Sequence, residues 1–155
     1  MVRQKNIALV AHDNRKEDLI DWVLWNYKIL LPHKLISTGT TGKLVEQALL
    51  DKIESTNSNH TLNIIKLKSG PLGGDQQLGA LIAENKIDLM IFFWDPMQPH
   101  PHDVDVKALL RIAVLYNIPI ACNRSSADFI ISSPLMHQNY VPQLKDYSEY
   151  IDRKV

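Results

Sequence analysis

The sequence predicts a single-domain α/β protein with a mainly parallel five-stranded sheet between two layers of helices. Short apolar segments bounded by turn residues alternate along the chain with segments whose apolar residues repeat at helical spacing. The apolar segment Leu89 to Trp94 is hydrophobic without interruption, as expected of a central strand covered on both faces. At 155 residues, without an internal repeat or a long linker, the chain is expected to form one domain over residues 1–155.

The apolar segments give the expected strands, and the periodic segments between them give the expected helices. The five strands are predicted at Asn6 to Ala11, Lys34 to Thr38, Leu62 to Leu67, Asp88 to Trp94 and Ile118 to Cys122. Helices are predicted over Leu19 to Leu30, Leu44 to Leu49, Leu78 to Glu84 and Val106 to Val114, with shorter ones at Ala127 to Ile131 and Tyr147 to Arg153. The segment Asp51 to His60 is polar and rich in Ser and Asn, which predicts a surface loop.

The charge balance limits the partners of the protein. Lys and Arg together number 17, as do Asp and Glu, so no overall field recruits nucleic acid or an anionic membrane. Met1 to Asn6 has no apolar signal region, and no apolar run is long enough to span a bilayer. We therefore expect a cytoplasmic protein that binds neither nucleic acid nor membrane. The single cysteine, Cys122, excludes an intrachain disulfide and is expected to be a buried hydrophobe rather than a nucleophile.

Polar residues follow four consecutive predicted strands. In parallel α/β sheets, ligands bind in the crevice beyond the carboxyl ends of the strands, so these residues are expected to share one edge. They lie at His12 to Lys16, Ser37 to Lys43, Ser69 to Gln77 and Asp95 to Asp105. The shared location is the main indication of a functional site.

The segment Thr38 to Gly42, Thr-Gly-Thr-Thr-Gly, precedes a predicted helix. Such a turn can hold phosphate on backbone N–H groups and hydroxyls. It is not a Walker A loop, because Leu44 stands where the magnesium-binding Ser or Thr is required. The alternative is an ordinary helix cap with Thr41 as the capping residue. Lys16, in the first turn of another predicted helix, opposes the dipole preference for acids there, which favours a bound anion nearby.

Asp75 ends a glycine-rich segment, Ser69 to Gly74, where a helix is predicted to begin. Glycines without a Cβ let the backbone approach a ligand closely, and a helix N-terminus favours negative charge. Asp is also a favoured N-cap residue, so Asp75 could cap the helix, serve in a site, or both.

A cluster of histidines and acids follows the fourth predicted strand. It consists of His100, His102, Asp103 and Asp105. Imidazole and carboxylate can bind metal, but ligands this close together in a proline-rich loop are unusual for zinc, and we expect no metal site. The alternative is acid–base chemistry by His12 and His102, since histidine exchanges a proton most readily near neutral pH. His12 could also be a structural turn histidine.

Five of these segments, in order, resemble the methylglyoxal synthase family. They are Ile7 to Asp13, Thr38 to Gly42, Ser69 to Gln77, Phe92 to Pro96 and Pro101 to Asp103. The resemblance extends from about Lys5 to the segment Tyr147 to Arg153. The chain departs from the family at Asp51 to His60, a polar segment longer than expected, which would alter the surface or subunit contacts.

The resemblance implies a carbon–oxygen lyase that converts dihydroxyacetone phosphate to methylglyoxal and inorganic phosphate without a cofactor, the methylglyoxal bypass of glycolysis. It implies Asp75 as the base and His102 as the electrophile and proton shuttle. The implied substrate contacts are His12, Lys16, Thr38, Gly39, Thr40, Thr41, Ser69, Gly70 and His102. The resemblance further implies a homohexamer that phosphate can inhibit, with a possible phosphate contact from Arg153. The same fold also resembles the effector-binding domains of carbamoyl phosphate synthetase and a purine-pathway cyclohydrolase, which need the phosphate turn but no base.

Overall fold

The computed structural model describes residues 3–97 and 103–153 and contains one five-stranded sheet. The strands are β1 (Asn6–Ala11), β2 (Lys34–Thr38), β3 (Asn63–Leu67), β4 (Leu89–Phe93) and β5 (Ile120–Ala121). Their order in the sheet is β3-β2-β1-β4-β5, and every neighbouring pair is parallel. The α/β prediction is confirmed, and β1 and β2 have the predicted bounds. The other strands lie inside the predicted segments and are shorter.

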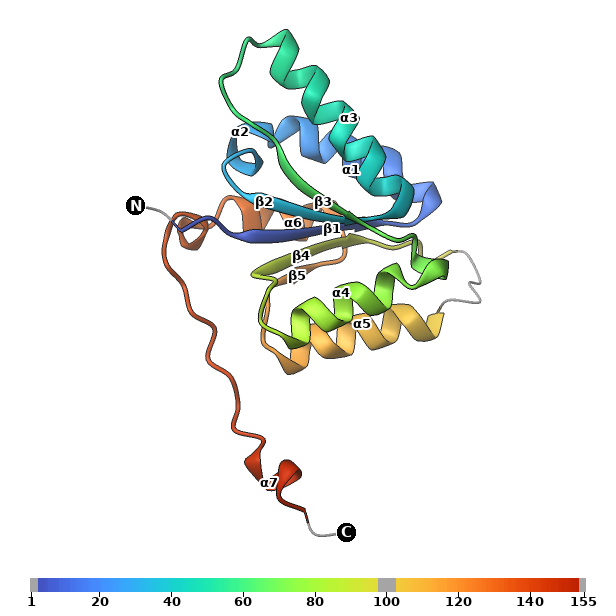
Figure 1. Cartoon of the computed structure of the whole chain (residues 1–155), viewed down its shortest axis with the longest axis vertical. Coiled ribbons are helices and arrows are strands. Elements are labelled where there is room, and N and C mark those ends of the chain that lie inside the picture. The colour runs from blue at the N-terminus through green and yellow to red at the C-terminus, as the bar shows by residue number, and fades with distance from the viewer. Residues whose placement is uncertain (1–2, 98–102, 154–155) are drawn as a thin grey trace.

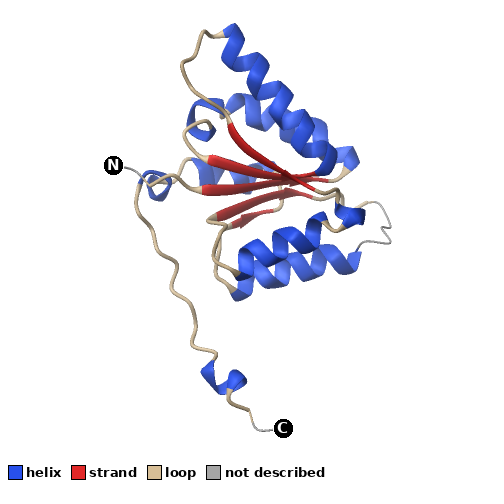
Figure 2. Ribbon diagram, in the orientation of Figure 1, coloured by secondary structure: helices blue, strands red, loops and turns tan. Residues whose placement is uncertain are grey.

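Helices cover both faces of the sheet (Figures 1 and 2). The helices are α1 (Lys16–Trp25), α2 (Tyr27–Leu30), α3 (Gly39–Ser55), α4 (Gly74–Ala83), α5 (Asp103–Leu115), α6 (Arg124–Ile131) and α7 (Ser148–Ile151), with short 3-10 helices η1 (Asp13–Arg15), η2 (Gly70–Leu72) and η3 (Pro134–His137). Helices α1, α2, α3 and α6 pack on one face, and α4 and α5 pack on the other. None of the described helices is long and apolar enough to cross a membrane.

The alternation of side chains along β1 explains the two cores. Ile7 and Leu9 belong to the core under α1 and α3, whereas Ala8 and Val10 belong to the core under α4 and α5. Successive residues of a strand point to opposite faces, so a strand buried on both faces reads as continuously hydrophobic. The same holds for β4, in which all five residues are buried.

Two predicted elements were wrong in their extent. The helix predicted over Leu19 to Leu30 is divided at Asn26, which leaves the helical conformation at a φ of −105° and a ψ of 17° and whose side-chain amide donates to the carbonyl of Trp22 at 2.9 Å. The loop predicted at Asp51 to His60 is helical as far as Ser55. Its polar residues belong to the exposed side of α3, where Gln47 donates to Asp51 one turn later at 2.8 Å.

The C-terminal arm, residues 138–153, runs from the amino-end edge of the sheet past the end of α5 (Figures 1 and 2), where the Asn117 side chain donates to the carbonyl of Gln143 at 2.9 Å. The arm begins after η3, where the Lys5 side chain donates to the carbonyl of Gln138 at 3.1 Å. It is extended over residues 138–147 and ends in the single turn α7.

Candidate functional site

The connectivity of the sheet reverses direction between β1 and β4. From β1 the chain proceeds outward through β2 to β3, then returns to β4 on the other side of β1. Ligands of open α/β sheets bind at such a reversal, outside the carboxyl ends. The segments that follow β1, β2, β3 and β4 therefore carry the candidate site residues, as the sequence predicted.

The turn after β2 is the first turn of α3. Thr38 is the extended N-cap residue, and Gly39 has a φ of 43°, which a residue with a side chain rarely adopts. A Cβ on Gly39 would also lie 2.7 Å from the Cα of Ser69, so glycine lets this turn pack against the segment after β3. The first turn of α3 carries no acidic side chain. Its backbone N–H groups form an arrangement suited to an anion.

The alternative of Thr41 as a helix cap was wrong, because the N-cap residue of α3 is Thr38. Thr41 is inside α3, and its buried hydroxyl donates to the carbonyl of Ala11 at 3.3 Å. The hydroxyl thus ties the helix to the end of β1. Any contact between Thr41 and an anion would use its backbone N–H group.

Lys16 connects the end of β1 with the turn after β2. It is the first residue of α1, and its Nζ lies 2.6 Å from Oδ1 of Asp13 and donates to Oγ1 of Thr40 at 2.5 Å. The ammonium group is thereby held beside the first turn of α3. Asp13 was not among the predicted site residues, although its position three residues before Lys16 was an available signal.

Asp75 lies in the first turn of α4, beside the glycine-rich turn. The N-cap residue of α4 is Gly73, with a φ of 103°, so the alternative of Asp75 as the N-cap was wrong. A Cβ on Gly70 would meet Oδ2 and Oδ1 of Asp75 at 3.1 and 3.4 Å. The carboxylate therefore lies against the backbone of Gly70, which the glycine leaves accessible.

His12 is held by the segment after β4. The backbone N–H of Asp95 donates to Nδ1 of His12 at 3.1 Å, and the imidazole makes an edge contact with Phe92, with ring centroids 5.4 Å apart. Because Nδ1 accepts this hydrogen bond, the neutral ring carries its proton on Nε2. Asp95, 5% exposed, accepts from Asn14 at 3.1 Å and from the backbone of Met97 at 3.0 Å. His12 thus has a fixed ring and a defined tautomer.

A second carboxylate lies close to Asp75. Asp105, in α5, lines a cavity of about 120 Å³ between α4 and α5 together with Asp75. Gln76 Nε2 donates to Oδ1 of Asp105 at 3.3 Å and so bridges the two helices. The sequence had indicated Asp105 only as a possible metal ligand. Among the described residues, no group of three or more His, Cys, Asp or Glu side chains could hold a metal ion.

The other predicted residues are not part of the arrangement among the described residues. His100 and His102 lie outside the described residues. Cys122, predicted to be buried, is partly exposed, because β5 ends at Ala121 and the cysteine lies beyond the sheet. Arg153 is in the C-terminal arm, with its guanidinium 4.5 Å from the ring centroid of Tyr150.

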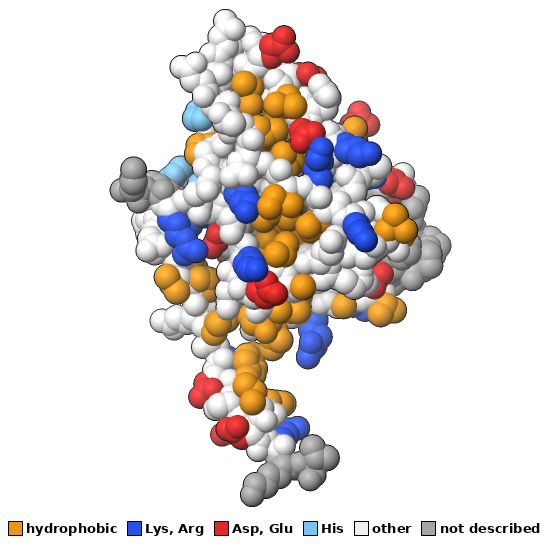
Figure 3. All heavy atoms as spheres, viewed as in Figure 1, with side chains coloured by type: hydrophobic (Ala, Val, Ile, Leu, Met, Phe, Trp, Pro, Cys, Tyr) orange, Lys and Arg blue, Asp and Glu red, His pale blue; other side chains and the backbone are white. Residues whose placement is uncertain are grey.

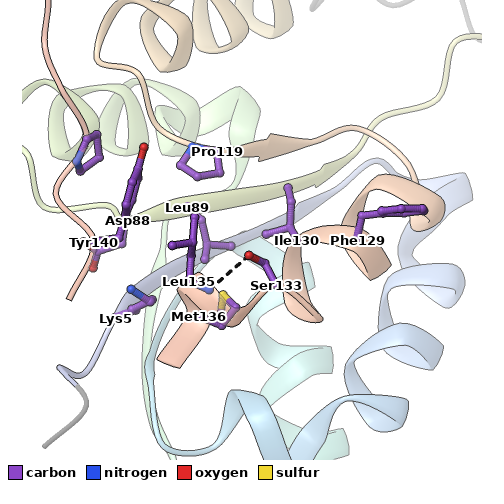
Figure 4. A pocket seen from close by; sticks show the side chains of 11 residues that line it. Lys5, Asp88, Leu89, Pro119, Phe129, Ile130, Ser133, Leu135, Met136 and Tyr140 are labelled. Atoms are coloured by element: carbon purple, nitrogen blue, oxygen red, sulfur yellow. Dashed lines mark hydrogen bonds between the residues drawn. The ribbon is translucent and has the colours of Figure 1, made fainter. Parts of the chain in front are cut away.

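Another cavity lies at the opposite edge of the sheet, between β4, α6, η3 and the base of the arm (Figure 4). It has a volume of about 320 Å³. Its walls are mainly apolar, with Leu89, Pro119, Ile130 and Met136 among them. This cavity contains none of the predicted site residues.

Comparison with known proteins identifies the family. The model of the MGS-like domain matches residues 18–122. The chain belongs to this family. A relative from Oleidesulfovibrio alaskensis, named methylglyoxal synthase, is 57% identical over 153 residues, which cover 99% of this chain and 97% of the relative. Another of that name, from Maridesulfovibrio salexigens, is 56% identical over the whole of both chains.

A solved structure supports the same family. The crystal structure of methylglyoxal synthase from Elizabethkingia anophelis NUHP1 superposes with a TM-score of 0.86 at 47% sequence identity. The match covers 100% of this chain and 97% of that one. The match to this structure includes the residues before position 18 that carry His12 and Lys16.

Proposed function

We propose that the protein is a methylglyoxal synthase, which converts dihydroxyacetone phosphate to methylglyoxal and inorganic phosphate. The observation that carries the proposal is that the Asp75 carboxylate lies beside a predicted phosphate site. The carboxylate lies against Gly70, the neighbouring Ser69 packs against Gly39, and Lys16 is held by Thr40 in the same turn as Gly39. A base and a phosphate site are the two components that this reaction needs in one place. The family and the relatives named methylglyoxal synthase support the assignment.

The proposed phosphate contacts come from three strand ends. Lys16 supplies positive charge, and the first turn of α3 and the glycine-rich turn supply backbone N–H groups. The residues are Lys16, Thr38, Gly39, Thr40, Thr41, Ser69 and Gly70. His12 donates from Nε2 to the substrate in this proposal. His102, outside the described residues, is the proposed electrophile and proton shuttle.

In the proposed reaction Asp75 removes a proton from the carbon next to the carbonyl group. The electron pair of that C–H bond forms the carbon–carbon double bond of an enediolate, whose oxygen is stabilised by aimed hydrogen-bond donors in a site that excludes water. The enediolate then expels phosphate by cleavage of the C–O bond on the other side of the carbonyl carbon, while its enediol hydroxyl loses a proton and becomes the aldehyde. The resulting enol is protonated at its CH₂ carbon to give the methyl group of methylglyoxal, and the proton on Asp75 is released so that the base is restored. The elements of the substrate are conserved in the two products, and no cofactor is needed.

The proposal is tested by incubating the purified protein with dihydroxyacetone phosphate and measuring methylglyoxal and phosphate. We expect both products in equal amounts, with and without a chelator. Asp75→Asn should reduce kcat by about 10²- to 10⁴-fold, the usual contribution of a general base, while phosphate still raises the Tm. Asp51→Asn, a change of the same kind on the exposed side of α3, is the matched control.

Other outcomes of this experiment would separate an enzyme from a binding module. A module of the same fold would bind phosphate without releasing methylglyoxal. Full activity of Asp75→Asn would refute its role as the base. An unchanged Tm of the wild type in phosphate would argue against the anion site, because a ligand that binds only the folded state raises the Tm.

The C-terminal arm supports the proposal of a homohexamer. It carries exposed apolar side chains, including Val141, Tyr150 and Ile151, the last 81% exposed. Figure 3 shows hydrophobic side chains along the arm and at its junction with the body. Exposed apolar groups of this kind mark contact surfaces, and α7 lies far from the crevice of its own chain in Figure 1, so Arg153 would reach a phosphate only in another subunit. Light scattering after size-exclusion chromatography tests the hexamer.

We also propose that inorganic phosphate, as a product, inhibits the enzyme and that the protein is cytoplasmic. Phosphate would occupy the same backbone N–H groups and Lys16 as the phosphate of the substrate. Inhibition measured at several substrate concentrations would show whether the two compete. Fractionation of cells that produce the protein tests its location.

A further inference from the structure

Gln77 ties the helix of Asp75 to the end of β3. Its side-chain carbonyl Oε1 accepts a hydrogen bond from the backbone N–H of Lys68 at 2.9 Å. Lys68 directly follows β3 and precedes Ser69 and Gly70. We infer that Gln77 is a positioning residue, which fixes Asp75 relative to the turn that holds the phosphate. The inference rests on the proposed function.

The first turn of α4 packs directly on the backbone of this segment. The backbone N–H of Gly74 donates to the carbonyl of Ser69 at 2.9 Å. A Cβ on Gly74 would lie 1.9 Å from the carbonyl oxygen of Lys68, so only glycine fits. The Gln77 side chain, which accepts from the N–H of Lys68, attaches the helix to the same segment one turn farther along. Two separated attachments fix both the position and the rotation of α4.

Rotation of α4 determines where the Asp75 carboxylate lies. The buried Leu78 and Ile82 hold the apolar side of α4 in the core, and the Gln77 bond holds its exposed side to the end of β3. Without that bond, we expect the first turn of α4 to shift against Lys68, and Asp75 with it. The carboxylate lies against the backbone of Gly70, so a shift of α4 changes its place relative to that turn. Misplacement of a reacting group by about 1 Å can reduce the rate by about 10²-fold. Gln77 therefore affects the proton transfer far more than the folding.

The same contacts predict which kinetic constant changes. Most of the proposed phosphate contacts come from Lys16 and the first turn of α3, which do not depend on Gln77. Ser69 remains attached to α4 through the backbone N–H of Gly74 when Gln77 is replaced. Loss of the Gln77 bond should thus reduce kcat and leave KM and the affinity for phosphate nearly unchanged. The N–H of Lys68 is exposed and can bind water instead, so the cost in stability should be that of one exposed hydrogen bond.

The test is steady-state kinetics on three variants. Gln77→Met keeps the length of the side chain and removes the acceptor, and Gln77→Glu restores an acceptor oxygen. Gln47→Met is the matched control, since Gln47 also makes an exposed side-chain bond on a helix, to Asp51. We expect Gln77→Met to lower kcat tenfold or more, with KM for dihydroxyacetone phosphate and Kd for phosphate within about threefold of wild type. Gln77→Glu should recover most of kcat at a pH above the titration of both carboxyl groups.

Three outcomes would overturn the inference. The first is a kcat of Gln77→Met within twofold of wild type. The second is an equal loss in Gln77→Met and Gln77→Glu, which would show that the acceptor is not what matters. The third is a loss of activity in proportion to a loss of folded protein, measured by circular dichroism. If Gln77→Met does not fold, Gln77→Asn, whose carbonyl is too short to reach Lys68, replaces it. Absence of activity in the wild type would instead refute the proposed function.

Discussion

The carboxylate of Asp75 lies against Gly70 so closely that a methyl group on the glycine would come within 3.1 Å of Oδ2. Such a contact is tighter than an ordinary van der Waals contact, so one of the two groups would have to move by a few tenths of an ångström. The Gly70 position is therefore a direct probe of how exactly Asp75 must be placed.

We expect Gly70→Ala to reduce kcat by about tenfold. Displacing a reacting group by about 1 Å can reduce the rate by about 10²-fold, and the shift of Asp75 expected here is a few tenths of that distance. The Tm should change by only a few degrees, since the carboxylate is at the partly exposed end of a side chain. Activity assays and thermal unfolding on the same preparation check both statements. A wild-type kcat would show that Asp75 tolerates the displacement.

Two glycines of α4 should respond oppositely to alanine. In Gly74→Ala the new Cβ would lie 1.9 Å from the carbonyl oxygen of Lys68, so backbone must move, and we expect a loss of about 1–3 kcal/mol or more in the free energy of unfolding. In Gly79→Ala the Cβ meets nothing within 4 Å, and the better helix propensity should add about 0.5–1 kcal/mol. Urea unfolding of both variants measures the difference. Equal stabilities would contradict the close packing of α4 on Lys68.

Lys16 should contribute to anion binding. Lys16→Met removes a charged donor that is fixed beside Thr40, and hydrogen bonds to charged groups contribute about 1.5–3 kcal/mol. We therefore expect the Kd for phosphate, measured by calorimetry, to rise by about tenfold or more. Lys107→Met, which removes an exposed lysine from α5, is the control and should bind phosphate like the wild type.

His33 should make the protein less stable as the pH falls. The side chain is 4% exposed, and its Nδ1 accepts from the backbone N–H of Lys5 at 3.1 Å. Burial, followed by the positive charges of Lys5 and His137, lowers the pKa of His33 below 6.5, and Asp88 opposes this change. As the pH falls below 6.5, His33 is protonated in the unfolded chain but stays neutral in the folded protein. The free energy of unfolding therefore decreases until the pH reaches the pKa of His33 in the folded state.

The measurement is the Tm of wild type and His33→Asn between about pH 7 and about pH 5. The wild-type Tm should fall more steeply than that of the variant, which has no proton to take up at this position. His60→Asn, a change at an exposed histidine, should follow the wild-type curve. Parallel curves for wild type and His33→Asn would show that the buried imidazole does not contribute.

The sequence predicted the sheet well because strands buried on both faces leave a simple hydrophobic pattern. It located β1 and β2 to the residue, and the structure brings predicted residues after β1, β2 and β3 together at one edge of the sheet. The pattern was less informative where solvent-exposed polar residues are helical, as in residues 51–55 of α3. It also could not reveal the division at Asn26, which depends on a local hydrogen bond to Trp22.

The individual contacts of the site could not be predicted from the pattern alone. The bond of Lys16 to Thr40 joins residues 24 positions apart, and the close approach of Gly39 to Ser69 depends on the order of the strands in the sheet. A cap role for Thr41 was the alternative that the sequence left open, because threonine often caps helices, yet its hydroxyl donates to the carbonyl of Ala11. Such pairings become visible only when the strand ends are placed side by side.

The close approach of backbone to backbone at Gly39 and Gly74 also restricts how this protein can evolve. A side chain at either position would collide with the main chain of the segment after β3, at Ser69 or at Lys68. A second substitution can replace a bulky side chain with a smaller one, but it cannot remove backbone atoms. A substitution of either glycine therefore requires the backbone of the neighbouring segment to move, and we expect single substitutions at these two positions to be rejected during evolution.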